Sequence, residues 1–206
     1  MQQLLLELAP PPEPTLENFV PGRNAAALRA IQDIASGSGA ERFIYLWGDP
    51  GSGRSHLLRA LDRAAAGRVV IADDVHKLSD EAQIALFDDY NRMRAAGGAL
   101  VAGGSAAPAH LPLREDLRSR LAWGLAFQLH PLSDDEKAAA LRARAGERSL
   151  HLAEDVIAHL LRHAPRDMAS LTGIVDALDR YSLEQKRPVT LPLLRDALNR
   201  LKQRAA

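Results

Sequence analysis

The sequence predicts an α/β domain with an open, mainly parallel sheet, followed by a smaller domain made only of helices. Between residues 19 and 131, short runs of strand-forming apolar residues alternate with segments of helical periodicity, a pattern typical of a parallel sheet with crossover helices. After Pro131 the strand-like runs stop and only helical segments follow. We therefore expect a flexible tail over residues 1–18, an α/β core over 19–131 and a helical lid over 132–206.

The tail is expected because residues 9–14, APPPEP, exclude a helix and favour an extended chain. In the core, the first helix is expected from Asn24 to about Ala35, where Gly37 and Gly39 end the apolar periodicity. The expected strands are 42–47, 68–74, 99–104 and 124–130. Further helices are expected to start near Gly53 and to cover 79–98 and 113–121.

The lid is expected to contain four helices. They are predicted at residues 133–147, 153–163, about 167–184 and about 191–202. Ser133 and Glu136 have the spacing of a capping box, in which each side chain accepts a hydrogen bond from the backbone N–H group of the other residue.

Composition and charge exclude several function classes. Lys+Arg and Asp+Glu are both 26, whereas a protein that grips DNA unaided usually has a basic excess. Cysteine is absent, which fits a reducing compartment and excludes a thiolate metal site. No segment approaches the roughly 20 apolar residues of a spanning helix, and the N-terminus lacks the basic start of a signal peptide. We therefore expect a cytoplasmic protein without membrane contact or sequence-specific DNA binding of its own.

The segment WGDPGSGRSHLL carries the main functional pattern. Its residues 48–55 match the phosphate-binding loop G-x-x-x-x-G-K-[ST] except that Arg54 replaces the lysine. The segment lies between a predicted strand and a predicted helix, where backbone N–H groups and the helix dipole favour phosphate. Arginine keeps the charge but not the shape of lysine, so we expect phosphate binding to survive and phosphoryl transfer to suffer. The expected nucleotide-binding residues here are Gly48, Asp49, Pro50, Gly51, Ser52, Gly53, Arg54, Ser55 and His56.

Two acids follow the second predicted strand, RVVIADD. Asp73 and the hydroxyl of Ser55 are the expected ligands of a nucleotide-bound Mg²⁺ ion. Asp74 occupies the position where ATPases keep a water-activating acid. The alternative is that the two aspartates only terminate the strand.

Two other segments are candidates for binding partners. Arg118 and Arg120 are two positions apart on a short helix, so one could stay on the surface while the other reaches a partner's phosphate; both could also be solvated. In the tail, QLLLEL could bind a groove as an extended peptide or remain a frayed terminus. The residues that would make those contacts are Gln3, Leu4, Leu6 and Leu8.

Several of these segments occur together in the order of a known family. FVPGRN, GDPGSGRSHLL, IADD, DLRSRLAWGL, PLSDDEK and LPLLRDAL resemble the AAA+ domain of the bacterial replication initiator DnaA. The sequence more closely resembles the shortened DnaA homologues of the Hda type, which share the arginine in GRSHLL and a tail peptide of the form Q-L-x-L-x-L. The resemblance covers nearly the whole chain.

The resemblance implies a regulatory function. Hda-type proteins convert ATP-bound DnaA to its ADP form after the sliding clamp is loaded, which makes the DnaA AAA+ domain and the clamp the implied partners and places the protein at the nucleoid. Gln3, Leu4, Leu6 and Leu8 would then dock on the clamp, and Val20, Pro21 and Gly22 would lie near the adenine. Arg120 would be an arginine finger acting on the partner's γ-phosphate. The implied cofactor is ADP or ATP with Mg²⁺, with ADP favoured, and a homodimer is left open.

The sequence also departs from the family pattern. Only residues 56–72 separate Ser55 from Asp73, which leaves no room for one edge strand of the family's sheet, so we expect four strands. Gly104 and Ser105 stand where a polar sensor is usual, and Ala169 stands where the lid carries a phosphate-sensing arginine. Whether the nearby Arg166 replaces that arginine is left open.

These departures favour a protein that acts on another protein's ATP over an efficient ATPase. Arg54, Gly104 and Ala169 stand at positions that would serve the chain's own nucleotide. Arg120 and the clamp peptide, in contrast, would contact other proteins. Two alternatives stay open: an autonomous AAA+ ATPase, and a nucleotide-free adaptor that recruits partners to the clamp.

Overall fold

The structure, a computed structural model, describes residues 12–165, 167–185 and 188–195. Residues 14–131 form one compact unit, and the chain from residue 132 onward belongs to a second. Among the described residues, no helix is both long and apolar enough to cross a membrane.

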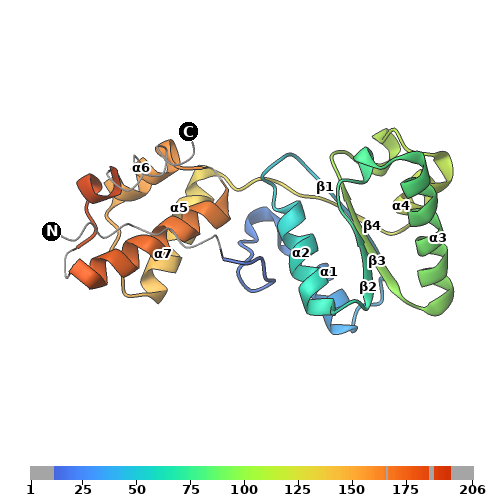
Figure 1. Ribbon diagram of the computed structural model, residues 1–206, viewed down its shortest axis with the longest axis horizontal. Coiled ribbons are helices and arrows are strands. Elements are labelled where there is room, and N and C mark those ends of the chain that lie inside the picture. Colours follow the sequence, from blue (N-terminus) through green and yellow to red (C-terminus); the bar gives the residue numbers. More distant parts are fainter. Residues whose placement is uncertain (1–11, 166, 186–187, 196–206) are drawn as a thin grey trace. The chain divides into compact units, whose positions relative to one another are not determined.

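The unit of residues 14–131 is built on a four-stranded parallel sheet (Figure 1). The strands are β1 (Phe43–Trp47), β2 (Val69–Ala72), β3 (Ala99–Gly104) and β4 (Leu125–Gln128). Their order is β2-β3-β1-β4, and all three neighbouring pairs are parallel. The four-stranded parallel sheet expected from the sequence is therefore confirmed, and the carboxyl ends of all strands lie along one edge of the sheet, where ligands collect in open α/β folds.

Helices cover both faces of this sheet. The first pair, α1 (Ala25–Ser36) and α2 (Arg54–Ala65), lies on one face, and the second pair, α3 (Asp80–Ala96) and α4 (Glu115–Trp123), lies on the other (Figure 1). Three single-turn helices lie in the connections: η1 (Gly22–Asn24), η2 (Val75–Lys77) and η3 (Pro108–His110).

Local sequence explains where these helices begin and end. The Ser79 hydroxyl accepts a hydrogen bond from the backbone N–H of Ala82 at 3.3 Å and caps the start of α3. Gly37 ends α1 with φ +75°, a left-handed conformation that glycine adopts without steric cost.

Apolar side chains fill both sides of the sheet. Ile31, Leu57 and Leu61 are fully buried between the sheet and the first helix pair. Leu117 is equally buried on the opposite side. Burial of each such side chain is worth about 1.5–3 kcal/mol. Leu16, expected in the flexible tail, is only 8% exposed and belongs to the first of these clusters.

The second unit contains α5 (Asp134–Glu147), α6 (Glu154–His163) and α7 (Met168–Gln185). Ser133 and Glu136 form the expected capping box at the start of α5, with bonds of 3.1 and 2.7 Å. Residues 191–195 are helical, and the rest of the fourth expected helix lies outside the described residues. The helices pack through fully buried apolar residues, which are Leu141, Val156, Leu160, Leu171, Val175, Leu178 and Leu194.

Candidate functional site

The phosphate-binding loop links β1 to α2 with a backbone that requires glycine. Gly51 and Gly53 have φ values of +83° and +92°. A Cβ atom on Gly48 would lie 2.3 Å from the carbonyl oxygen of Leu129, so only glycine fits there. No side chain caps the N-terminus of α2 within this described segment, which leaves N–H groups of its first turn available to an anion.

Ser52 adds a polar group to this loop. The residue is 4% exposed, and its Oγ atom has no hydrogen-bond partner among the described residues. Leaving a buried hydroxyl unpaired costs about 1–3 kcal/mol. An oxygen-rich ligand bound in the loop would supply a partner, so the loop residues fit a phosphate group.

Arg54 binds the ends of two neighbouring strands. Its Nε atom donates to Asp73 Oδ1 at 3.0 Å, and Nη1 donates to the carbonyl oxygen of Gly104 at 2.7 Å. Its Nη2 atom donates to Asp74 Oδ1. The Arg54 side chain is only 15% exposed, and each nitrogen of its guanidinium donates a hydrogen bond within the protein.

Two glycines at the end of β3 make room for this arrangement. A Cβ atom on Gly103 would lie 2.9 Å from Arg54 Cδ, and one on Gly104 would lie 2.0 Å from the hydroxyl oxygen of Tyr45. That hydroxyl donates to the carbonyl oxygen of Ala106 at 2.9 Å, and burial raises the pKa of Tyr45 beyond its usual range. No larger residue fits at the sensor position, Gly104, without displacing Tyr45.

The expected magnesium ligands are already engaged. Ser55 Oγ donates to Asp73 Oδ2 at 2.5 Å, and Asp73 Oδ1 also accepts from the backbone N–H of Asp74 at 2.8 Å. The other oxygen of Asp74 accepts from Lys77 Nζ at 2.7 Å. Hydrogen bonding to Lys77, assisted by the Arg54 charge, lowers the pKa of Asp74. Arg54 and Lys77 therefore hold one oxygen of Asp73 and both oxygens of Asp74, whereas Asp73 Oδ2 is paired with the Ser55 hydroxyl. This hydroxyl and carboxylate oxygen are donors of the type that a Mg²⁺ ion prefers.

The segment expected near the adenine is fixed at both ends. At one end Phe19 lies against the loop, because a Cβ atom on Gly53 would lie 2.6 Å from its ring. At the other end Asn24 exchanges two hydrogen bonds of 2.8 Å with the backbone N–H and C=O of His130. Between these anchors lie Val20, Pro21 and Gly22, the last with φ +47° at the start of η1.

Sequence reasoning missed the role of Asn24. An asparagine before a predicted helix suggests a cap, but Asn24 makes no capping bond with its side chain. Its partner lies 106 positions away, and no local pattern indicates that contact.

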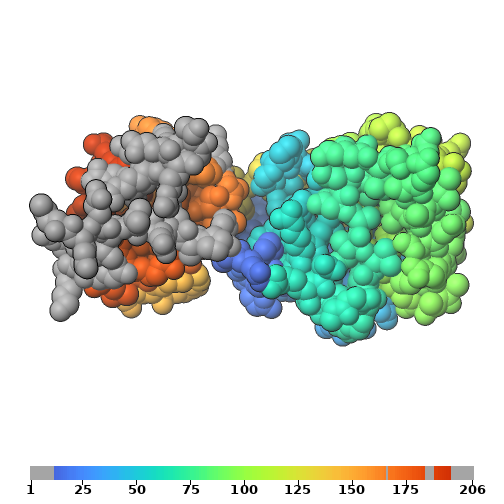
Figure 2. Space-filling view, in the orientation of Figure 1, coloured from blue at the N-terminus to red at the C-terminus, as the bar shows by residue number. Residues whose placement is uncertain are grey.

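His56, one of the expected nucleotide-binding residues, contacts the chain segment that ends at Phe19. Its Nε2 atom lies 3.0 Å from the carbonyl oxygen of Thr15, and its ring centroid is 5.4 Å from that of Phe19. Figure 2 shows this first part of the unit, in blue, against the surface of the unit. Burial lowers the pKa of His56. Because a carbonyl oxygen only accepts, Nε2 is the donor in the bond to Thr15.

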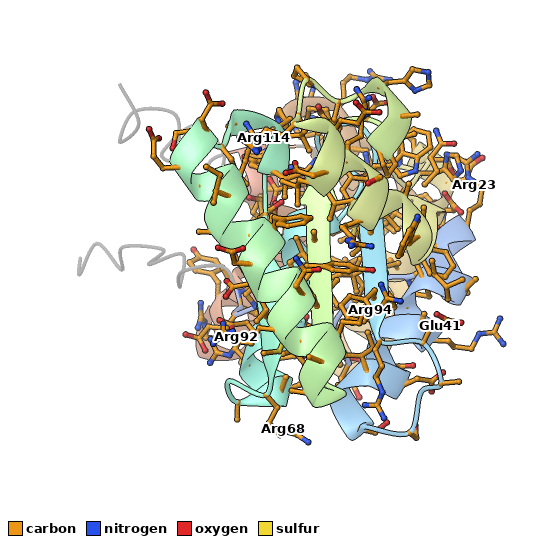
Figure 3. All side chains as sticks on the ribbon, turned by 90° about the vertical axis from the view of Figure 1, so that its right-hand side faces the viewer. Arg23, Glu41, Arg68, Arg92, Arg94 and Arg114 are labelled. Carbon is orange, nitrogen blue, oxygen red and sulfur yellow. The ribbon has the colours of Figure 1, made fainter. Side chains whose placement is uncertain are left out.

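Arg120 lies on aromatic side chains of α3 and α4. Its guanidinium carbon is 4.4 Å from the ring centroid of Trp123, 5.8 Å from that of Phe87 and 5.9 Å from that of Tyr90. Trp123 is 63% exposed and also contacts Arg94 at 5.2 Å. Arg92 and Arg94 lie on opposite sides of α3, so only the second reaches α4 (Figure 3).

Other predicted residues fall at different places. Ala169 is in α7, within the second unit. Gln3, Leu4, Leu6, Leu8 and Arg166 lie outside the described residues.

Sequence comparisons point to one family. A family model described as the lid domain of Hda matches residues 134–198. An uncharacterised protein of Haemophilus influenzae is 31% identical over 229 residues, covering 96% of this chain and 99% of the relative. The aligned length exceeds the 206 residues of this chain, so the relative contains residues that this chain lacks.

Solved structures show the same fold. Domain III of the replication initiation protein DnaA from Thermotoga maritima has a TM-score of 0.70 and 21% identity, over 91% of this chain and 96% of that chain. AMPPCP-bound DnaA from Aquifex aeolicus has a TM-score of 0.67 and 21% identity, over 87% of this chain and 68% of that chain. RuvB from T. maritima has a TM-score of 0.61 and 12% identity, over 90% of this chain and 71% of that chain.

These comparisons agree with the architecture described above. The sheet, the phosphate-binding loop and the helical second unit are those of a DnaA-like AAA+ fold. The lid match and the full-length relative place the sequence within that fold group. The chain belongs to the Hda-type family of DnaA-like AAA+ proteins.

Proposed function

We propose that this protein is a negative regulator of replication initiation that stimulates hydrolysis of DnaA-bound ATP, with Arg120 as the arginine finger acting in trans. The observation that carries the proposal is the contrast between two arginines. Arg54, in the chain's own nucleotide loop, uses its guanidinium internally. The Arg120 guanidinium contacts aromatic rings, and within the described residues it forms no hydrogen bond or ion pair. Its donors are therefore left for an anion on another molecule.

The chain's own site supports nucleotide binding better than turnover. The loop backbone and Ser52 fit phosphate, and the DnaA of A. aeolicus binds AMPPCP. Asp74, the candidate water-activating acid, is bound by Arg54 and Lys77. A carboxylate held by two cations is a poor acceptor of a water proton, because its pKa is lowered. We expect ADP as the bound nucleotide and little hydrolysis by the isolated chain.

Residues 1–8 would tether the protein to the sliding clamp. The pattern of Gln3 followed by leucines at positions 4, 6 and 8 supports docking of an extended peptide. Tethering to a DNA-loaded clamp would confine the activity to the nucleoid and to the period after replication has begun. The near-neutral composition fits this indirect association with DNA.

Hydrolysis of DnaA-bound ATP in the presence of DNA-loaded clamp tests the proposal. An arginine finger supplied in trans is worth about 10³–10⁵ in NTP hydrolysis, so Arg120→Ala should abolish stimulation. Arg118→Ala, on the same helix, is the matched control and should keep it. A chain lacking residues 1–8 should stimulate only at much higher concentration. Stimulation that survives Arg120→Ala would contradict the finger assignment.

One observation favours a second function, that of a nucleotide-free adaptor. The internal bonds of Arg54 stabilise the loop without any phosphate. An adaptor of this kind would bind clamp and DnaA but would neither bind ADP nor stimulate hydrolysis. An autonomous ATPase, in contrast, would turn over ATP alone and lose that activity in Asp74→Ala.

A further inference from the structure

We infer that Arg94 is a second partner-binding residue of the surface around Trp123, where it pairs with a carboxylate of the ATP-bound partner beside the phosphate that Arg120 reaches. The inference deepens the proposed function and rests on it. It adds a residue that recognises the partner, and it states that the partner surface next to the nucleotide is acidic.

Arg94 and Arg120 approach one exposed ring from two helices. Arg94 lies in the last turn of α3, and Arg120 lies in the last turn of α4. Their guanidinium carbons are 5.2 and 4.4 Å from the ring centroid of Trp123. Burial raises the pKa of Tyr90, and the charges of both arginines oppose that rise, so both guanidiniums act on the same phenol. The two arginines and Trp123 therefore form a single surface.

This surface carries two positive charges that the chain does not neutralise. Within the part of the chain that the structure describes, neither Arg94 nor Arg120 forms a hydrogen bond or an ion pair. Because both guanidiniums lie near the same ring centroid, their charges are within about 10 Å of each other, which is the Debye length at about 0.1 M salt. Their mutual repulsion is therefore only partly screened, and an anion from another molecule would relieve it.

The neighbouring Arg92 shows that the free charge is a property of one side of α3. Arg92 and Arg94 lie on opposite sides of this helix (Figure 3). Arg92 pairs with Asp89 of its own helix, whereas Arg94 contacts Trp123 of α4. A cation in the last turn of a helix also stabilises the helix dipole. That role requires neither an exposed ring nor a second arginine at the same ring, so it does not account for the arrangement.

The chemistry of the expected anion follows from the position of each arginine. A guanidinium that lies over a ring keeps N–H donors at its edge, and their fork matches the two oxygens of a carboxylate. The proposed function assigns the partner's γ-phosphate to Arg120, which is the less exposed of the two arginines. Arg94 is exposed, so its anion should lie on the partner's surface beside the nucleotide. The anions that a protein presents at its surface are the carboxylates of aspartate and glutamate.

The two arginines should therefore affect different quantities. A charge pair at the edge of an interface acts mainly on association and on its salt dependence. Arg94 should determine how tightly the partner binds, whereas Arg120 should determine how fast the bound ATP is hydrolysed.

Titration of ATP-bound DnaA with the full chain, in the presence of DNA-loaded clamp, separates these quantities. For Arg94→Ala we expect the concentration for half-maximal stimulation to rise by about three- to tenfold, with a maximal rate within about twofold of the wild type. Arg94→Lys keeps the charge and should lose less than Arg94→Ala, and Arg94→Glu reverses the charge and should lose more. Arg92→Ala, on the opposite side of α3, is the matched control and should behave as the wild type.

Binding of the full chain to DnaA loaded with AMPPCP gives a second readout that does not depend on hydrolysis. The Kd of the wild type should rise with added salt, because a charge pair contributes to binding. Arg94→Ala should weaken binding and also reduce this salt dependence. Thermal unfolding of each variant shows whether it is folded.

The inference is overturned if Arg94→Ala binds AMPPCP-loaded DnaA as tightly as the wild type, or if Arg92→Ala weakens binding equally. It is also overturned if Arg94→Ala lowers the maximal rate by more than about tenfold at an unchanged half-maximal concentration, because Arg94 would then act on the phosphate. Stimulation that is lost in Arg120→Ala but kept at every concentration in Arg94→Ala would overturn this inference alone. Binding that depends on Arg94, without any stimulation by the wild type, would overturn the proposed function alone.

Discussion

At the residue scale, Trp123 determines how Arg120 is presented. Trp123 is 63% exposed, and its ring centroid lies 4.4 Å from the Arg120 guanidinium carbon. An exposed cation–π contact of this kind is worth about 0.5–1 kcal/mol. The contact holds the long arginine side chain near one position, which reduces the entropy lost when it reaches a partner's phosphate.

We therefore expect Trp123→Ala to lower stimulation of DnaA-bound ATP hydrolysis by about two- to fivefold without unfolding the chain. Trp123→Phe keeps an aromatic ring and should retain most of the stimulation. Hydrolysis assays with both variants, alongside thermal unfolding, measure the effect. Equal activity of the alanine variant and the wild type would show that the ring does not position the arginine.

Single residues also mark where sequence reasoning stops. The replacement of lysine by Arg54 is visible in the sequence, but its three bonds are not, because one of them joins residues 50 positions apart. The same holds for Asn24 and His130, which are hydrogen-bonded although 106 positions separate them. A sequence motif shows which residue types are present. Their hydrogen-bond partners depend on which strand ends become neighbours in the folded sheet.

At the element scale, the segment before η1 is tied to α2 by His56. The ring contacts Thr15 and Phe19, and burial lowers its pKa, with the charge of Arg59 acting in the same direction. In the unfolded chain the histidine has its ordinary pKa, so the unfolded state binds more protons between the lowered and the ordinary pKa. The free energy of unfolding therefore falls as the pH drops below about 6.5.

Urea unfolding between pH 5.5 and 7.5 checks this expectation. The wild type should lose stability toward pH 5.5, and His56→Gln, which can still donate a hydrogen bond, should show a flatter pH dependence. His110→Gln, whose residue is exposed, serves as the control and should keep the wild-type slope. An unchanged slope in His56→Gln would contradict the assignment.

Elements were the best predicted level of the structure. Helix starts at Ser79 and Ser133 follow from short capping patterns, and the strands follow from runs of apolar residues, because both depend on neighbours within a few positions. The prolines before Leu16 dominate the local pattern and predict a tail there. The burial of Leu16 in the apolar cluster on the α1 and α2 side of the sheet is tertiary, and the local sequence does not express it.

At the scale of the whole molecule, the two units carry separate sources of stability. In the second unit, Asp176 on α7 accepts hydrogen bonds from Arg144 at 3.1 Å on each oxygen and pairs with Arg148 at 3.1 Å. Its side chain is 18% exposed. The Asp176 carboxylate therefore connects α7 to Arg144 of α5 and to Arg148, the residue after α5. No residue of the nucleotide loop takes part in these bonds.

Asp176→Ala should destabilise this second unit by about 1–3 kcal/mol, since it removes the carboxylate that Arg144 and Arg148 share and leaves each with one acidic partner, Glu147 or Asp179. Nucleotide binding by residues 14–131 should be unchanged. Hydrogen exchange of α5 and α7, together with ADP binding, tests both statements. Glu154→Gln, which loosens a surface pair with Arg142, is the control and should cost much less stability than Asp176→Ala, because Glu154 is 73% exposed. If Asp176→Ala also reduced the exchange protection of β1 or β3, the stability of the two units would not be independent.

The position of Trp123 also makes the protein suitable for fluorescence. The chain has two tryptophans, and the other, Trp47, is the last residue of β1 and directly precedes the phosphate-binding loop. Each of the two candidate regions therefore contains one intrinsic fluorophore. Trp47→Phe leaves an emission spectrum that reports the surroundings of Arg120, and Trp123→Phe leaves one that reports the nucleotide loop. Nucleotide loading and partner docking can thus be followed separately, in real time, with no attached dye.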